Sequence, residues 1–449
     1  MSELTTGYLF PKEKLKRLIF PLIIEQTLAI TVGMADTMMI SSAGEAAVSG
    51  VSLVDMINVV LINIFAALAT GGAVIASQYI GSRNSQKACE AAKQLLIVTI
   101  GISFLIMGLT IAFRRPLLRL FFGNIHEDVM TNALLYLFIS SLSYPFLALY
   151  NSCAALFRSM GNSKISMKIS LLMNVINITG NAVFIFGFQK GVAGAAIASL
   201  ISRIVAAAVM LKLLCNQKNE IHISFQEKWK LDFSMMKRIL RIGVPNGLEN
   251  SFFQLGRVIV VSIIASFGTV QIAANAVANN LDSLGCIPGQ AMSLAVITVV
   301  GQCIGAGDVK QAIYYTKRLL RFTYVLMIGL NTMILIALPW ILKIYNLSEE
   351  TIQLATILIV VHNAAAMILW PLSFTLPNAL RAANDVKFPM IVSVFSMLTF
   401  RIAFSYILGS YFHLGAIGVW IAMIMDWVFR VTCFAGRFHN GKWKTFKTI

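Results

Sequence analysis

The chain has 449 residues, of which 58% are hydrophobic and only 12% are charged. Soluble globular proteins carry about 25% charged residues, so this composition excludes a sizeable soluble domain. The net charge of +17 does not point to nucleic acid. Lys and Arg lie in short loops between apolar segments, as in membrane proteins, and do not form the stripe of a nucleic-acid-binding face.

The beginning of the chain has no basic region followed by a short apolar core and a small-residue cleavage site. We therefore expect no cleaved signal peptide. The first apolar segment, from Leu15 to Ile40, exceeds the roughly 20 residues that a helix needs to cross a bilayer.

Apolar segments of similar length recur along the chain, and we expect each to be a helix, because a spanning helix satisfies its own backbone hydrogen bonds in lipid. They are long and continuous, unlike the short alternating segments of a membrane β-barrel. The twelve predicted spans cover residues 15–40, 50–78, 92–113, 130–157, 165–188, 191–215, 239–266, 270–301, 318–342, 351–379, 388–411 and 414–436.

The distribution of Lys and Arg predicts the orientation of these spans. With the N-terminus inside, most basic residues lie in inside loops, in agreement with the positive-inside rule. The outside loops then hold only Arg114, Arg115, Arg119, Lys190 and Lys343. We expect both termini in the cytoplasm and the chain in a bacterial plasma (inner) membrane.

The two halves of the chain resemble each other at a nearly fixed spacing. Matching positions include Pro21 and Pro245, Glu25 and Glu249, Gly44 and Gly268, Arg158 and Arg381 (with a slip of one), and Gly191 and Gly415. A duplicated six-helix unit relates its halves by an axis along the membrane normal, with a cleft between them. The predicted fold is an all-α membrane protein with twelve transmembrane helices in two homologous six-helix bundles around a central cleft. The expected domains are an N-lobe at 1–215, a cytoplasmic linker at 216–236 and a C-lobe at 237–449.

The sequence contains none of the common motifs for phosphate binding, metal binding or disulfide exchange. No GxxxxGK[ST] phosphate loop and no HExxH motif occurs, and the five histidines show no ligand spacing. The six cysteines form no CxxC, and we expect free thiols. We expect no enzyme and no cofactor, so the energy for transport would come from an ion gradient.

Ionisable and amide side chains inside the first-half spans are candidates for an ion site, because such groups are costly in a membrane. Asp36 is a carboxylate toward the outer end of the first span, with a helix-end cap as its alternative role. Asn174, Asn177 and Asn181 lie in the fifth span. Asn177 and Asn181 are four residues apart and share a helical face. Their oxygens suit a hard cation, although amides also serve interhelical hydrogen bonds.

Charged residues also occur inside the second-half spans. They form either a network for proton coupling or substrate binding, or a set of structural ion pairs. They are Glu249, Arg257, Asp282, Arg401 and Asp426. Glu25 and Asp55 are further first-half candidates. Pro21 and Pro245 occupy matching positions, where a proline either kinks a helix as a hinge or begins it.

Several short motifs resemble the multidrug and toxic compound extrusion (MATE) family, and their order and spacing cover essentially the whole chain. They are Met34-Ala-Asp-Thr-Met38, Ser77-Gln-Tyr-Ile-Gly81, Asn177-Ile-Thr-Gly-Asn181, Gly191-Val-Ala-Gly-Ala195 and Gly301-Gln-Cys-Ile-Gly305. The resemblance implies an efflux antiporter of bacterial type, driven by Na⁺ or H⁺.

The same resemblance implies a cation site at Asp36, Asn177, Asn181 and Ser199. The family places a second carboxylate where this chain has Asn181, and a threonine where it has Ser199. A site with one carboxylate attracts Na⁺ less strongly, which favours H⁺, while Na⁺ at Asp36 stays open. Glu249 lies nearer the proline than the family's acidic position in that helix.

The sequence therefore predicts a secondary active antiporter that exports small organic compounds, cationic or amphiphilic, in exchange for H⁺ or Na⁺ by alternating access. The expected partners are these substrates and the lipid bilayer, with no nucleic acid, and the expected state is a monomer. The alternatives are a lipid-linked oligosaccharide flippase of related fold and a non-transporting membrane scaffold.

Overall fold

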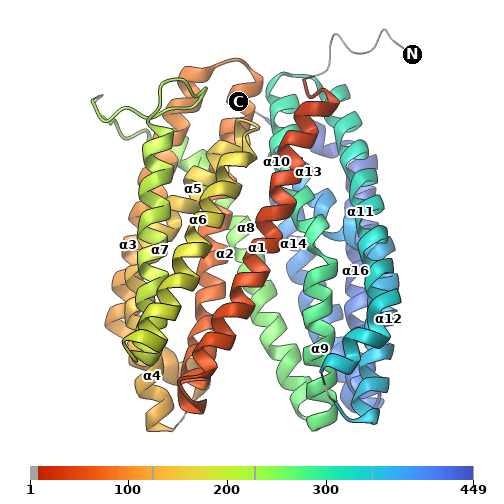
Figure 1. Ribbon diagram of the computed structural model, residues 1–449. Coiled ribbons are helices and arrows are strands. Elements are labelled where there is room, and N and C mark those ends of the chain that lie inside the picture. The colour runs from red at the N-terminus through yellow and green to blue at the C-terminus, as the bar shows by residue number, and fades with distance from the viewer. Residues whose placement is uncertain (1–8, 124–125, 227–228, 346, 448–449) are drawn as a thin grey trace. The chain divides into compact units, whose positions relative to one another are not determined.

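The computed structural model describes residues 9–123, 126–226, 229–345 and 347–447. Within these ranges the chain is helical and contains no strand (Figure 1). This confirms the predicted all-α class.

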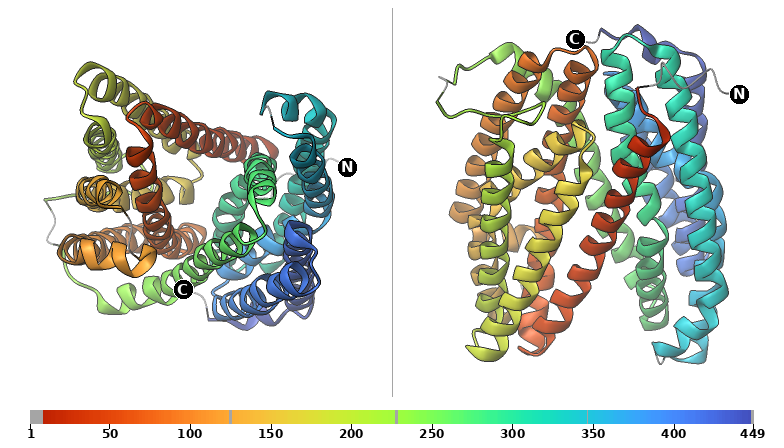
Figure 2. Two further views of the ribbon diagram at one scale, coloured as in Figure 1. Left: turned by 90° about the horizontal axis from the view of Figure 1, so that it is seen from below. Right: turned by 45° about the horizontal axis from the view of Figure 1, so that its top comes forward.

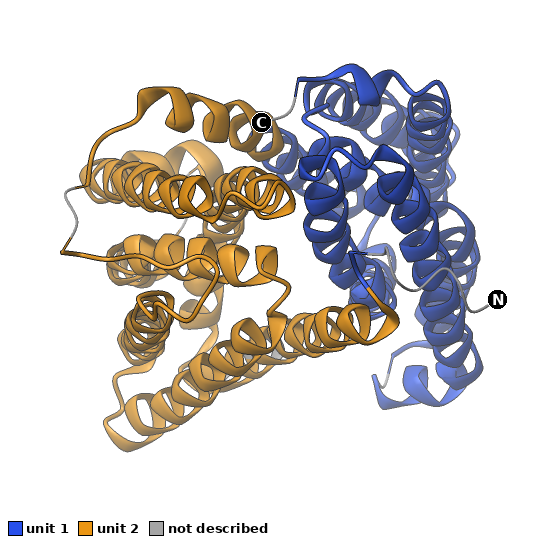
Figure 3. Ribbon diagram, turned by 90° about the horizontal axis from the view of Figure 1, so that it is seen from above, with its two compact units in different colours: residues 1–10, 248–449 blue, residues 11–247 orange. Residues whose placement is uncertain are grey.

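Contacts within the chain divide it into two compact units, coloured separately in Figure 3. Unit 2 is Pro11–Gly247, and unit 1 combines Leu248–Ile449 with Met1–Phe10. The division falls inside one helix, α8 (Phe233–Ala265), beyond the predicted linker at 216–236. The three predicted domain ranges and the central cleft stay predictions.

Unit 2 contains the first seven helices and the beginning of α8. Its elements are α1 (Lys12–Ser41), α2 (Glu45–Gly81), α3 (Ser85–Phe122), α4 (Glu127–Leu142), α5 (Tyr144–Ser159), α6 (Ser163–Asn181), the π-helical segment η1 (Ala182–Gly187) and α7 (Gly191–Leu214). Helix α6 packs between α1 and α7, as the neighbouring red and yellow ribbons show (Figure 2).

Unit 1 contains the rest of α8 and the remaining elements. They are α9 (Thr269–Gly285), α10 (Ile287–Gly305), α11 (Val309–Ile344), α12 (Glu349–Trp370), η2 (Pro371–Thr375), α13 (Leu376–Ala382), α14 (Lys387–Ser396), η3 (Met397–Ala403), α15 (Phe404–Tyr406), η4 (Ile407–Tyr411), α16 (Gly415–His439) and η5 (Lys442–Thr445).

The number of helices able to cross a membrane agrees with the predicted spans. Eleven described helices are long and apolar enough, and the pair α4 and α5, bent by 47°, makes twelve if it counts as one span. The bend lies at Ser143, between the two helices, and Pro145 is in the first turn of α5, where proline is favoured. The predicted span 270–301 is likewise broken into α9 and α10, beside Pro288.

Large apolar side chains are exposed along the outer faces of these helices. On α3 alone, Phe104, Leu105, Leu109 and Phe113 are all at least half exposed. Exposed apolar surface on this scale is unfavourable in water and suits contact with lipid tails. The structure is therefore that of a multi-pass membrane protein.

The duplication predicted from sequence is visible in the local structure. Helices α2 and α9 begin at Glu45 and Thr269, and their starting points have the same separation as Pro21 and Pro245. Gly44 and Gly268 precede these two helices with φ of 100° and 103°. Such positive φ values favour glycine, which explains why the same residue recurs there.

Candidate functional site

A chain of hydrogen bonds in unit 2 joins the four residues predicted to form a cation site. The Asn181 amide nitrogen donates to Asp36 Oδ1 at 2.6 Å and to Asn177 Oδ1 at 3.3 Å. The Asn177 amide nitrogen donates in turn to Ser199 Oγ at 2.9 Å. We call these four residues the Asp36 cluster. It connects α1 with α6 and α7, which are distant from α1 in sequence.

The local sequence explains why the cluster can form. Asn177 and Asn181 are four residues apart on α6 and present their amides on one helical face. Asn181 is the last residue of α6, and the π-helical segment η1 follows it. Wider π-helical turns of this kind are rare and occur frequently at functional sites.

Within the Asp36 cluster, one buried oxygen has no hydrogen-bond partner. This atom is Oδ1 of Asn181, a residue that is 1% exposed. A buried polar atom without a partner is costly unless a ligand completes it. Together with the Asp36 carboxylate, the Asn177 amide and the Ser199 hydroxyl, it offers the hard oxygen atoms that suit H⁺ or Na⁺.

The residues that the structure describes contain no group of three or more His, Cys, Asp or Glu side chains placed to hold a metal ion. A sodium ion at the Asp36 cluster would therefore depend on one carboxylate and on neutral amide and hydroxyl oxygens. This agrees with the departure from the family pattern at Asn181.

Two further charged residues of unit 2 act on the cluster. Asp55 on α2 and Arg203 on α7 both interact electrostatically with Asp36. Arg203 also donates to Ser143 Oγ at 2.5 Å. The three charged groups sum to one negative charge, which one monovalent cation would neutralise. Asp55 was among the predicted candidates. Arg203 was missed, although a charged residue inside the predicted span 191–215 was a usable signal.

The remaining first-half candidates lie outside the hydrogen-bond chain. Asn174 is buried on α6 with an unpaired amide nitrogen. Glu25 on α1 accepts from Arg158 of α5 at 3.3 Å and from the Ser166 hydroxyl of α6 at 2.6 Å. Glu25 is thus part of a buried ion pair that ties three helices together.

Of the five charged residues predicted in the second half, Glu249 is paired separately, whereas Arg257, Asp282, Arg401 and Asp426 interact electrostatically with one another. Glu249 on α8 binds Arg381 of α13 at 2.6 Å, and Asn378 also accepts from this arginine. Because Glu249 and Arg381 match Glu25 and Arg158 in the repeat, each unit contains the same buried ion pair. Its presence in both copies favours a structural role for Glu249.

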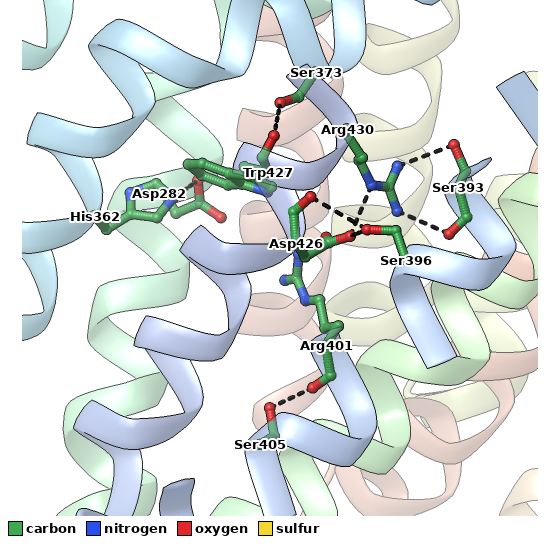
Figure 4. Close-up of polar contacts among 10 residues, drawn as sticks. All are labelled: Asp282, His362, Ser373, Ser393, Ser396, Arg401, Ser405, Asp426, Trp427 and Arg430. Atoms are coloured by element: carbon green, nitrogen blue, oxygen red, sulfur yellow. Dashed lines mark hydrogen bonds and ion pairs between the residues drawn. The ribbon is translucent and has the colours of Figure 1, made fainter. Parts of the chain in front are cut away.

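Asp282 and Asp426 belong to separate pairs in unit 1 (Figure 4). Asp282 on α9 lies 2.9 Å from His362 Nε2 of α12, and the His362 ring contacts Trp420 and Trp427 edge-on. This histidine was not among the predicted site residues, since an isolated histidine carries no sequence signal.

Asp426 on α16 is buried between two arginines (Figure 4). It accepts from Arg430 Nε at 2.9 Å and from the Ser396 hydroxyl, and it lies 3.7 Å from Arg401 Nη1. Arg430 also donates to the hydroxyl and carbonyl oxygens of Ser393. Sequence analysis missed Arg430, which is four residues after Asp426 on the same helix.

Pro21 and Pro245 both lie inside helices. Pro21 is in α1 and Pro245 is in α8, each more than two turns after the helix begins. The alternative that these prolines begin their helices is therefore wrong. Both remove a backbone hydrogen bond where a helix can bend.

Comparison with known proteins gives one consistent result. The model of the protein family described as MatE matches residues 21–183 and again 245–407, so the two matches begin at the repeated prolines. A Bacillus subtilis protein named an uncharacterized transporter, YisQ, is 29% identical, with 92% of this chain and 90% of the relative covered. A probable multidrug resistance protein, NorM, from Thermotoga maritima is 26% identical, with 96% of this chain and 93% of the relative covered.

A solved structure has the same fold. It is described as the outward-facing conformation of a multidrug resistance MATE family transporter of the MOP superfamily, and it superposes with a TM-score of 0.90. The match covers 97% of both chains at 21% sequence identity.

Proposed function

This chain belongs to the MATE family, and from that premise we propose that it exports small organic compounds in exchange for a monovalent cation. The proposed substrates are cationic or amphiphilic drug-like molecules. The proposed location is a bacterial plasma membrane with both termini in the cytoplasm. The observation that carries the proposal is the Asp36 cluster, which combines one carboxylate with an unpaired buried oxygen within spanning helices.

The cluster supports a coupling role because cation binding would change its hydrogen bonds. Asp36 now accepts a hydrogen bond from Asn181. A proton or sodium ion on Asp36 would compete with that bond and would neutralise the single negative charge shared with Asp55 and Arg203. Because α1 contacts α6 through this bond, cation binding would alter how α1 is held.

An ion can drive export only if its affinity differs between the inward-open and outward-open states. In the proposed cycle, substrate enters from the cytoplasm or inner leaflet and leaves on the other side. The cation then binds near Asp36 from outside and favours the return. Pro21 on α1 supplies a place for that helix to bend.

We favour H⁺ over Na⁺ as the coupling ion. The cluster has one carboxylate, and its other ligand atoms are neutral amide and hydroxyl oxygens. A proton needs one basic atom, whereas Na⁺ needs several oxygen ligands with enough negative charge to replace its water.

The test is efflux of ethidium, a lipophilic cation, from proteoliposomes of the purified protein. An imposed pH gradient and an imposed Na⁺ gradient are applied separately. We expect efflux to follow the pH gradient. Efflux that follows only the Na⁺ gradient would contradict the choice of H⁺, and efflux that ignores both gradients would contradict ion-coupled export.

A further inference from the structure

Unit 1 contains a polar pocket that the Asp36 cluster does not explain. Its polar side is formed by Arg257 of α8, Asn275 and Asn279 of α9, and Arg401 of η3. Its other walls are Val260, Val261, Val419, Trp420 and Met423. The pocket therefore joins positively charged and amide groups on one side to apolar and aromatic surface on the other.

The pocket lies at the positions of unit 1 that correspond to the Asp36 cluster in the repeat. When the two family matches are aligned from Pro21 and Pro245, Asp36 corresponds to Val260 and Asn177 to Arg401. Asp55 corresponds to Asn279 in the same way, so both carboxylates of unit 2 are replaced by neutral residues. At these positions unit 1 lacks both carboxylates and has the positive charge of Arg401. It has two carboxylates elsewhere, Asp282 and Asp426, where unit 2 has the neutral Asn58 and Ser202.

Arg257 adds to this charge and has no counterpart in unit 2, where Gly33 occupies the matching position. Among the described residues Arg257 has neither a hydrogen bond nor a close ion pair, although it interacts electrostatically with Asp282. Its side chain is exposed within the spanning helix α8. A charged side chain within a spanning helix is costly against lipid and normally faces water, a counter-charge or a ligand.

The carboxylates near the pocket are already engaged. Asp282 is bound to His362, and Asp426 is bound most closely to Arg430. Arg401 lies farther from Asp426, at 3.7 Å, and its buried Nε has no hydrogen-bond partner. Three arginines therefore face two carboxylates in this region, which leaves an excess of positive charge at the pocket (Figure 4 shows Arg401, Asp426 and Arg430).

The neutral groups of the pocket, like its arginines, suit a ligand that carries a negative charge. Trp420 Nε1 donates to Asn275 Oδ1 at 2.9 Å, so the Asn275 amide nitrogen is left as the donor. Arginine guanidinium groups bind planar oxyanions through paired hydrogen bonds. Trp420 and the valine walls offer apolar contact beside these donors.

We propose that this pocket binds amphiphilic organic anions, with a carboxylate or sulfonate held by Arg257 and Arg401 and an apolar body against Trp420. The pocket would thus select the anionic or zwitterionic members of the exported compounds. This substrate assignment rests on the proposed export function, whereas binding at the pocket is measured without transport.

The binding test compares two probes that differ only in charge. Dansylglycine carries a carboxylate on a fluorescent apolar body, and dansylglycine amide is its neutral counterpart. The protein is held in phosphatidylcholine nanodiscs, and binding is measured from dansyl fluorescence. We expect dansylglycine to bind at least about 10-fold more tightly, as a charge-assisted hydrogen bond to a guanidinium predicts. Equal affinities for the two probes would overturn the proposal.

Substitutions at Arg257 test whether the preference for dansylglycine over its amide arises at this pocket. Arg257→Gln removes the exposed charge and should bring the two probes to equal affinity, while Arg257→Lys should retain part of the preference. Arg321→Gln changes an exposed arginine of α11 in the same unit and serves as the matched control. An unchanged preference in Arg257→Gln, with the variant eluting as folded protein, would contradict the assignment.

Anionic phospholipids share the chemistry of the proposed ligands, so the measurement is repeated with phosphatidylglycerol in the nanodiscs. We expect dansylglycine still to bind. If phosphatidylglycerol abolishes the Arg257-dependent binding, the pocket is a lipid headgroup site and the proposal is wrong. Gradient-driven ethidium efflux without dansylglycine binding would overturn this inference alone, and dansylglycine binding without ethidium efflux would overturn only the export function.

Discussion

The regions around Asp36 and Asp55 in unit 2 and around the matching positions in unit 1 differ in charge. In unit 2, Asp36 and Asp55 outweigh the nearby Arg203. In unit 1 the corresponding pocket is lined by Arg257 and Arg401 and by no carboxylate among the described residues. The buried Glu–Arg pair, in contrast, occurs in both units, as Glu25 with Arg158 and as Glu249 with Arg381.

This contrast distinguishes the residues that stabilise the fold of each bundle from the residues that are proposed to bind a ligand. An ion pair that ties the first helix of each unit to a later helix is present twice, because each bundle meets the same packing requirement. The polar positions between helices have diverged, and we propose that one unit binds a cation and the other an anion.

The largest expected effect comes from breaking the shared ion pair. Glu249→Gln leaves the buried Arg381 without its counter-charge and should destabilise the protein by about 3–5 kcal/mol. Glu25→Gln should cost less, because its contact with Arg158 is longer, at 3.3 Å compared with 2.6 Å, and Arg158 is more exposed. Thermal unfolding in detergent measures both variants.

A double variant serves as the control for that prediction. Glu249→Leu with Arg381→Met removes both charges and should recover most of the lost stability. Equal melting temperatures for Glu249→Gln and the unaltered protein would show that the pair does not hold unit 1 together.

A smaller effect is expected from adding a second carboxylate to unit 2. Asn181→Asp places it next to Asp36 and beside the oxygens of Asn177 and Ser199. Because the unaltered protein is proposed to use H⁺, Asn181→Asp should introduce ethidium efflux driven by an imposed Na⁺ gradient, since a second negative ligand strengthens Na⁺ binding. Asn174→Asp, on the same helix but outside the hydrogen-bond chain, is the matched control. Equal Na⁺ responses of the two variants would show that Asn181 is not a ligand position.

The smallest effect is expected from Arg203. Its guanidinium opposes a cation at Asp36, so Arg203→Gln should lower the half-saturating concentration of the coupling ion, by about threefold for a screened charge at this range. If H⁺ is the coupling ion, the pH profile of efflux should shift upward. An unchanged profile would mean that Arg203 acts only through its bond to Ser143.

Hydropathy predicted the helical class and the spans, and i,i+4 spacing predicted that Asn177 and Asn181 share a face. The joining of these two residues with Asp36 and Ser199 was predicted from the resemblance to the MATE family. The sequence could not predict which charges pair. Glu249 and Asp282 were grouped together, yet they bind Arg381 and His362 on different helices. Such pairing depends on helix rotation and packing, which a single sequence does not reveal. Arg203 was not predicted because only oxygen-bearing side chains, which can bind a cation, were considered as candidates in the first half.

Gradient-driven ethidium efflux by Asp36→Asn proteoliposomes tests the central claim most directly. The substitution removes the carboxylate and retains the size of the side chain. Asp128→Asn, an exposed carboxylate at the start of α4, is the control. We predict that Asp36→Asn protein elutes as folded protein and loses gradient-driven efflux, whereas Asp128→Asn retains it. Normal efflux by folded Asp36→Asn protein would contradict the assignment of ion coupling to the Asp36 cluster.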